Sequence, residues 1–196
     1  SPKNKILGRT YLMEGALLND SFSQFYFGLF FLDKTFHCKK HALNIATNFL
    51  EKAANTGSPK HINSLALLYL ENPSLPDAIS HGIELLKMTA DQYNNSDAQA
   101  ILGCWFYQQQ DLSQSIYYLE RSSVPVSKLA LGKIYLESYP DSSDKVLGYY
   151  YLKLASDQGV NEAHLYISYI CLWYKLPTIA LKYLTLASKT DSRTSF

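Results

Sequence analysis

The chain has 196 residues, of which 47% are hydrophobic, and its 18 basic residues nearly balance 17 acidic ones. This length and composition allow one buried core or one compact repeat array, and they exclude a wholly disordered chain. A net charge of +1 provides no field that would steer the chain to nucleic acid or to anionic lipid.

Cysteine usage and the apolar runs indicate the compartment. Three cysteines, Cys38, Cys104 and Cys171, lie far apart, which argues against a disulfide framework. The runs at residues 22–32 and 165–176 are too short to cross a bilayer, because a membrane helix needs about 20 apolar residues. We therefore expect no membrane insertion and a reducing, cytoplasmic location, with the ER lumen, the mitochondrial intermembrane space and secretion as an effector as alternatives.

Apolar residues recur at helical spacing along the whole chain, and no segment has the alternation of a strand. Turn residues such as Pro59, Pro125 and Gly159 separate the helical segments. In chain order, we predict helices at residues 3–18, 21–33, 39–56, 60–71, 76–92, 96–109, 111–122, 125–138, 143–158, 161–174 and 176–189.

The helical segments repeat. Residues 51–69 align with residues 153–171, so that Gly57 falls on Gly159, and residues 14–31 align in the same register. Two further copies, one slightly longer and one shorter, bring the number of repeats to five. Each repeat has a small residue within a Leu-Gly-x-x-Tyr pattern. The small residues are Gly28, Ala66, Gly103, Gly132 and Ser168. We predict a single repeat domain over residues 1–196 with a half repeat at 3–18, units at 21–56, 60–92, 96–122, 125–158 and 161–189, and a tail at 190–196.

The repeated segments resemble a known family. DQGVNEAHLYIS (157–168), DAQAILGCWF (97–106), EKAANTG (51–57) and LALGKIYLES (129–138) are similar to the Sel1-like repeat, a longer relative of the tetratricopeptide repeat. The resemblance covers nearly the whole chain. It implies an all-α fold, a right-handed α-solenoid of about five helix-turn-helix repeats. It also implies a scaffold or adaptor that holds other proteins, without catalytic residues or cofactors of its own.

The first segment differs from the others. Aligning Gly15 and Ala16 with the later repeats puts residues 3–18 at a second-helix position with no first helix before it. Repeat arrays need polar terminal faces, and Leu7 and Met13 are among several apolar residues here. We expect either a fragment of a larger regulatory or assembly protein, or an edge that packs on a partner or on a second copy.

In solenoids of this superfamily the first helix of each unit lines the concave face. Positions three before, one after and four or five after the small residue should then point into the groove. An apolar, aromatic groove of this kind fits an amphipathic helix or an apolar peptide segment of another protein. The predicted contact residues are Phe25, Leu29, Leu32, Asn63, Leu67, Leu70, Tyr107, Lys133, Leu136, Glu137, Tyr169 and Trp173.

Two other functions stay open. The chain could directly regulate or inhibit a partner enzyme, as a bacterial effector does. The segment His37-Cys38-Lys39-Lys40-His41 offers three metal-binding side chains for a metal-dependent enzyme, but zinc needs three or four converging ligands and the two lysines would repel a cation. We interpret this segment as a polar loop and predict no metal site, no catalytic residue and no nucleic-acid partner.

Overall fold

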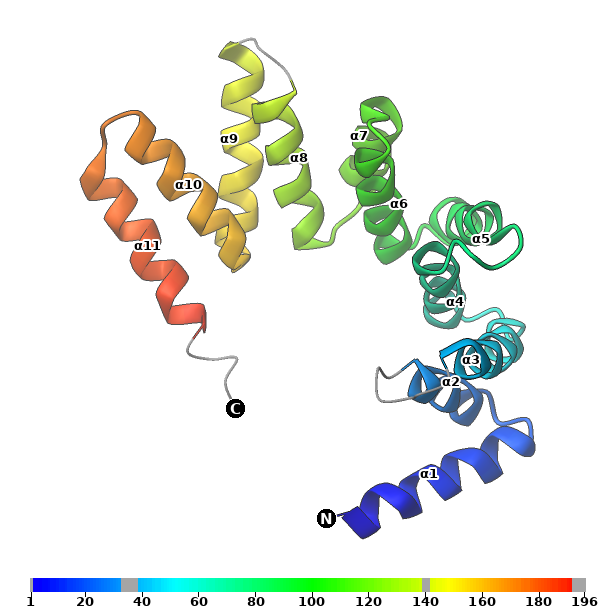
Figure 1. The fold of residues 1–196 in the computed structure, drawn as a ribbon. Helices are drawn as coiled ribbons and strands as arrows, with labels where there is room; N and C mark the ends of the chain where they lie inside the picture. The colour runs from blue at the N-terminus through cyan, green and yellow to red at the C-terminus, as the bar shows by residue number, and fades with distance from the viewer. Residues whose placement is uncertain (1, 33–38, 139–141, 192–196) are drawn as a thin grey trace. The chain divides into compact units, whose positions relative to one another are not determined.

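The computed structural model describes residues 2–32, 39–138 and 142–191, which form eleven α-helices and no strand (Figure 1). The helices are α1 (Pro2–Leu17), α2 (Ser21–Phe31), α3 (Lys39–Ala54), α4 (Pro59–Glu71), α5 (Ala78–Gln92), α6 (Ser96–Gln108), α7 (Leu112–Arg121), α8 (Pro125–Glu137), α9 (Ser142–Asp157), α10 (Asn161–Trp173) and α11 (Pro177–Asp191). Every predicted helix is present, and its ends lie within two residues of the prediction. The all-α repeat fold is therefore confirmed.

Local sequence sets the helix starts. Asp20 accepts a hydrogen bond from the backbone N–H of Ser23 at 2.7 Å, and so satisfies one of the free donors in the first turn of α2. Asp111 does the same at the start of α7. Pro59 and Pro125 stand in the first turns of α4 and α8, where a missing N–H does no harm.

The helix ends use left-handed residues, as the sequence indicated. Gly57 and Gly159 have φ of 79° and 82°, which only glycine adopts without strain. The junction between α5 and α6 lacks such a glycine, because Tyr93 stands there. Asn94 supplies the left-handed turn instead, with φ of 46°.

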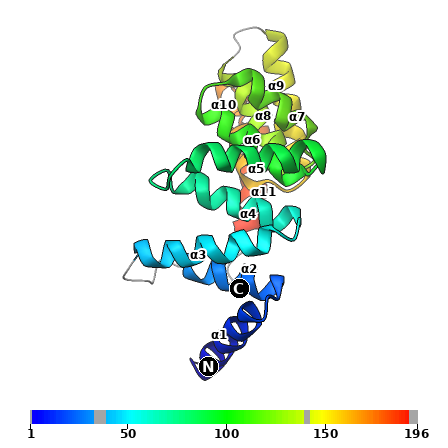
Figure 2. The same ribbon diagram turned by 90° about the vertical axis from the view of Figure 1, so that its right-hand side faces the viewer.

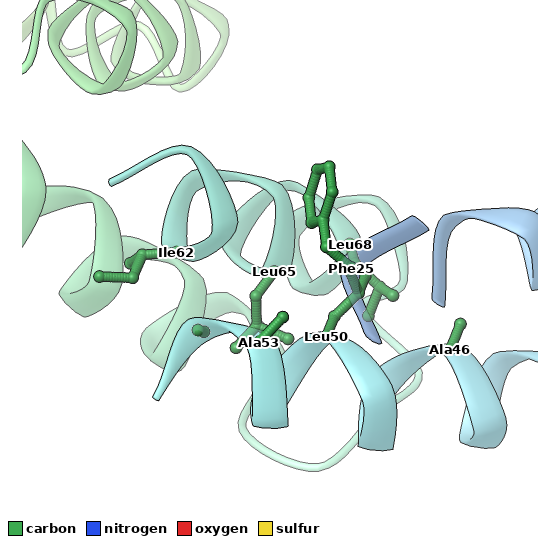
Figure 3. Packing of buried hydrophobic residues seen from close by; sticks show 8 residues of the cluster. Phe25, Ala46, Leu50, Ala53, Ile62, Leu65 and Leu68 are labelled. Atoms are coloured by element: carbon green, nitrogen blue, oxygen red, sulfur yellow. The ribbon is translucent and has the colours of Figure 1, made fainter. Parts of the chain in front are cut away.

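Contacts among the helices divide the chain into two compact units, residues 1–98 and residues 99–196. In the first unit, α2, α3, α4 and α5 stack in chain order (Figures 1 and 2). Its core joins three consecutive helices: Phe25 from α2, Leu50 from α3 and Leu65 from α4 lie in one buried cluster (Figure 3). In the second unit, Leu152 of α9 lies in a cluster with Ile167 of α10.

Within a repeat, the small residue of the Leu-Gly-x-x-Tyr pattern lets the two helices approach closely. The three glycines at this position each face a fully buried leucine of the second helix. A Cβ atom added at each glycine would lie 2.9 Å or less from the leucine Cγ, which is closer than carbon atoms pack. The pairs are Gly28–Leu50, Gly103–Leu119 and Gly132–Leu152.

Candidate partner-binding groove

A hollow of about 740 Å³ opens in the second unit where α8 ends, α9 begins, α10 ends and α11 begins. It is large enough for several side chains of a partner, because typical ligand pockets measure about 300–1,000 Å³. We call it the α8–α11 groove. Its lining residues are Leu136, Glu137, Lys145, Val146, Tyr149, Tyr166, Tyr169, Ile170, Cys171, Trp173, Tyr174, Leu176 and Ile179.

The groove forms because α9 and α10 are held together at one end and diverge toward the other (Figure 1). At the closed end, the backbone N–H of Val160 donates to the carbonyl of Ala155 at 3.0 Å. A ring nitrogen of His164 lies 3.2 Å from the carbonyl oxygen of Ser156. At the open end, side chains of α9 and α10 flank the hollow.

The lining is mostly apolar and aromatic. Tyr169 and Trp173 on α10 keep 65% and 74% of their surfaces exposed, and Val146 on α9 is also exposed. Large side chains that remain in water at a concave site are typical of a binding surface. Glu137 and Lys145 bring one charge of each sign, so the groove has no strong electrostatic preference.

Polar contacts beside the groove tie neighbouring helices together. The Tyr107 hydroxyl donates to Glu137 at 3.0 Å, and burial together with this bond raises the pKa of Tyr107. Lys133 of α8 pairs with Glu162 of α10 at 2.6 Å and lies over the Tyr166 ring. Burial disfavours the charged form of Lys133, but the contacts with Glu162 and Tyr166 together outweigh burial and raise the pKa of Lys133. Tyr107 and Lys133 thus link α6, α8 and α10 through their carboxylate partners.

The two cysteines that the structure describes have environments that suppress reactivity. Cys171 lines the groove and Cys104 is half-buried. Burial raises the pKa of both thiols, and for Cys104 it outweighs the nearby Lys133 charge. A catalytic cysteine needs a lowered pKa, because the thiolate is the nucleophile.

The structure distributes the twelve predicted contact residues over three environments. Four of them, Leu136, Glu137, Tyr169 and Trp173, meet in the α8–α11 groove. Tyr107 and Lys133 belong to the polar contacts beside it. The other six lie in the first unit: Phe25, Leu29, Leu32, Asn63, Leu67 and Leu70.

Phe25 and Asn63 pack between consecutive elements of the first unit. The Phe25 ring is 1% exposed and stacks on His61 with ring centroids 4.6 Å apart. Asn63 donates to the side chain of Asn95 at 2.9 Å and accepts from the Thr89 hydroxyl at 2.8 Å. Both side chains are buried by their own chain, so they offer no surface to a partner.

The remaining leucines of the first unit vary in exposure. Leu29 packs against the core cluster, and Leu70 lies against Gly82 of α5. Leu32 and Leu67 are exposed. A hollow between α4 and α5 contains none of the predicted residues. It is lined by Leu65, Tyr69, His81, Glu84, Leu85 and Met88.

Besides Tyr166, Ile170 and Cys171 of α10, sequence reasoning missed five apolar residues of the groove that lie outside the first helices. They lie on the second helices or at the turn between α10 and α11, whereas the prediction considered first helices only. The sequence did contain a signal for the residues at this turn, because the apolar run from Leu165 to Leu176 continues past the end of α10 at Trp173. These five residues are Val146, Tyr149, Tyr174, Leu176 and Ile179.

His37 and Cys38, on which the metal-site reading depends, lie outside the described residues. Among the residues that are described, no three His, Cys, Asp or Glu side chains converge to hold a metal ion. Over the same part of the chain, every helix is too short or too polar to cross a membrane.

No family model and no curated protein matches this sequence. Solved structures do match. A Sel1 repeat protein from Oxalobacter formigenes superposes with a TM-score of 0.72 at 19% identity, over 93% of this chain and 78% of that protein. The chain folds as a Sel1-like repeat solenoid.

Two further structures share the fold. The protein c5321, a protective antigen present in uropathogenic Escherichia coli strains, displays an SLR fold and matches with a TM-score of 0.71 at 19% identity, over 93% of this chain. The chain spans only 41% of c5321. MamA, a tetratricopeptide-like protein, matches with a TM-score of 0.56 at 18% identity, over 80% of this chain and 92% of MamA. At 18–19% identity, the likeness of this chain to these three structures is one of fold.

Proposed function

We propose that this chain is a non-enzymatic scaffold that binds an amphipathic helix of another protein in the α8–α11 groove. The observation that carries the proposal is the pair Tyr169 and Trp173, which stay exposed on the wall of a 740 Å³ hollow. Aromatic residues in such positions are the usual hot spots of protein interfaces.

The gain from covering these rings is substantial. A tryptophan side chain buries about 150–250 Å², and burial contributes about 25 cal/mol per Å². With 74% of its surface exposed, Trp173 alone would then stabilise a complex by about 3 kcal/mol. Apolar residues of a helix recur at every third or fourth position, so one face of a partner helix can fill the groove.

Other features support recognition rather than catalysis. The single Glu137 and the single Lys145 at the groove can select the orientation of a partner but cannot attract it over a distance. The Cys171 thiol in the groove has a raised pKa, which opposes a role as a nucleophile. The neighbours with the same fold are Sel1 and tetratricopeptide-like repeat proteins.

A capture experiment from the native host tests the proposal. The double variant Tyr169→Ala, Trp173→Ala removes both exposed rings, and Tyr150→Ala is the matched control, because Tyr150 is a 55% exposed tyrosine of α9 outside the groove. We expect the double variant to lose partners that the parent and the control retain, while all three have the same circular dichroism spectrum. If the folded double variant retains every partner, the groove is not the binding site.

A further inference from the structure

Comparing the repeats shows which positions the following repeat covers. In each first helix we consider the residue three before the small residue of the Leu-Gly-x-x-Tyr pattern. These residues are Phe25, Asn63, Ala100, Leu129 and Leu165. The first four are 9% exposed or less, whereas Leu165 of α10 is 47% exposed.

The second helices give the same result. Each second helix has a leucine at the position that faces the small residue, and in α11 this leucine is Leu184. The members of this series are Leu50, Leu86, Leu119, Leu152 and Leu184. The first four are 0% exposed, and Leu184 is 40% exposed. The pair α10–α11 therefore presents an apolar face that other repeats bury.

The structure also shows what kind of helix covers such a face. Leu129 and Leu152 lie in one cluster with Ile167 and Cys171 of the next first helix, α10. Ile167 and Cys171 occupy the Leu and Tyr positions of the Leu-Gly-x-x-Tyr pattern. In the first unit, Leu50 is likewise clustered with residues of the following first helix, α4. The open face of α10–α11 thus fits a helix that presents a Leu and a Tyr four residues apart.

The helix α1 contains the same pattern, but its Leu and Tyr side chains are exposed. Its sequence Leu7-Gly8-Arg9-Thr10-Tyr11 matches Leu131-Gly132-Lys133-Ile134-Tyr135 of α8 at the Leu, Gly and Tyr positions. Leu7 and Tyr11 are 52% and 62% exposed. A Cβ atom added at Gly8 would meet nothing within 4 Å, whereas one at Gly132 would collide with Leu152.

The packing of α1 on its own chain leaves this face open. Ala16, near the end of α1, is buried, and the backbone turn after it leads directly into α2. Arg9 turns toward α2 and lies over the Phe30 ring, 4.2 Å from its centroid. The face of α1 that contains Leu7 and Tyr11 therefore has the sequence pattern of a first helix, and no described part of the chain covers it.

We propose that the chain associates with a second copy of itself, head to tail. The Leu7 and Tyr11 face of α1 in one copy packs on the Leu165 and Leu184 face of α10–α11 in the next. The contact repeats between molecules the pairing that α9 and α10 make within one molecule. Because the two faces differ, the contact is heterologous and each dimer keeps one free face of each kind, so open chains can grow.

Self-association through these two faces is distinct from the binding of another protein in the α8–α11 groove and uses different residues. Leu7, Tyr11, Leu165 and Leu184 are absent from the groove lining. Self-association and groove binding can therefore be removed separately.

Sedimentation velocity on two complementary variants tests the proposal. In the α1-blocked variant, Leu7→Arg and Tyr11→Arg place charges on the α1 face. In the α11-blocked variant, Leu165→Arg and Leu184→Arg do so on the α10–α11 face. We expect the parent to sediment faster as its concentration rises, and each blocked variant to remain a monomer. An equimolar mixture of the two variants should form a one-to-one dimer and nothing larger, because one working face of each kind remains.

Several results would overturn the proposal. These are a parent that stays monomeric at every concentration, a blocked variant that associates like the parent, and a mixture that stays monomeric.

Leu18→Arg is the control, because Leu18 is an 82% exposed leucine outside the α1 pattern, and it should associate like the parent. If Leu184→Arg unfolds the chain, Leu181→Arg replaces it, since Leu181 is 62% exposed on the same helix. The α1-blocked variant should still capture groove partners, which separates failure of this proposal from failure of the proposed function.

Discussion

The close approach of the two helices within a repeat can be tested most sharply at the contact between Gly132 of α8 and Leu152 of α9. In Gly132→Ala, the new Cβ would lie 2.7 Å from Cγ and Cδ2 of Leu152 and 3.0 Å from the carbonyl oxygen of Gly148. Because one of these neighbours is backbone, α8 and α9 must move apart. Alanine favours a helix over glycine by about 1 kcal/mol, whereas overpacking a tight core costs about 1–3 kcal/mol. We expect a net loss of about 1 kcal/mol in the free energy of unfolding.

A double-mutant cycle isolates the contact. Leu152 is fully buried, so Leu152→Ala alone should cost about 2–5 kcal/mol. In the double variant the new methyl group at position 132 occupies space that the leucine vacated. The double variant should therefore lose less than the sum of the two single losses, by about 1 kcal/mol or more.

Urea unfolding followed by tryptophan fluorescence is a suitable assay, because both tryptophans, Trp105 and Trp173, lie in the second unit with Gly132. Gly8→Ala is the control, since Gly8 has the same place in the pattern but an open environment, and it should not lower stability. A Gly132→Ala variant as stable as the parent, or strictly additive losses, would refute the close-approach argument.

Three further predictions concern burial, titration and metal content. Leu184→Ala should cost less than half as much as Leu152→Ala in urea unfolding, because 40% of Leu184 is already exposed; equal losses would contradict the open face. Burial, reinforced by Glu120, raises the pKa of Tyr151 to about 12 from its ordinary value of 10. The stability that this provides is complete below pH 10 and is lost as the pH rises toward 12. Burial, reinforced by Glu51, raises the pKa of Tyr69 to about 12 as well, so absorbance at 295 nm should show at least two late-titrating tyrosines, of which Glu120→Gln shifts only Tyr151 downward. Elemental analysis of the purified chain should find far less than one zinc per molecule, whereas stoichiometric zinc would contradict the interpretation of residues 37–41 as a polar loop.

The helices could be predicted because their signals are local. Apolar spacing, Pro59 and Pro125 in first turns, and Gly57 and Gly159 after helix ends all act within a few residues, and the structure places each as expected. The role of the small residue was also visible, since it recurs in every unit. Asn94 replaced a glycine at one junction, which the helix pattern alone did not specify.

The groove was only partly predictable, because it depends on the angle between helices. Tyr169 and Trp173 followed from their register in the repeat. Val146 and Ile179 did not, because they meet the groove where α9 and α10 diverge, and no repeat register encodes that divergence. Phe25 and Leu165 occupy the same position of the repeat, but only Phe25 is buried by a repeat that follows it. Register thus predicts which side chains share a face, while burial depends on what is stacked next.

The α1 segment shows a signal that alignment in one register concealed. Aligning Gly15 and Ala16 with the small pairs of second helices predicted a half repeat. The Leu7, Gly8 and Tyr11 pattern of a first helix lies in the same segment. Ala16 is buried, whereas Leu7 and Tyr11 are exposed.

Site-specific photo-crosslinking from two neighbouring positions is the most direct test of partner binding in the α8–α11 groove. Tyr149 lines the groove and Tyr150, the next residue of α9, does not. With benzoylphenylalanine at either position, exposure to light in the native host extract should crosslink a partner protein from position 149 and not from position 150. Crosslinking from position 150 alone, or equally from both, would contradict the binding of a partner in this groove.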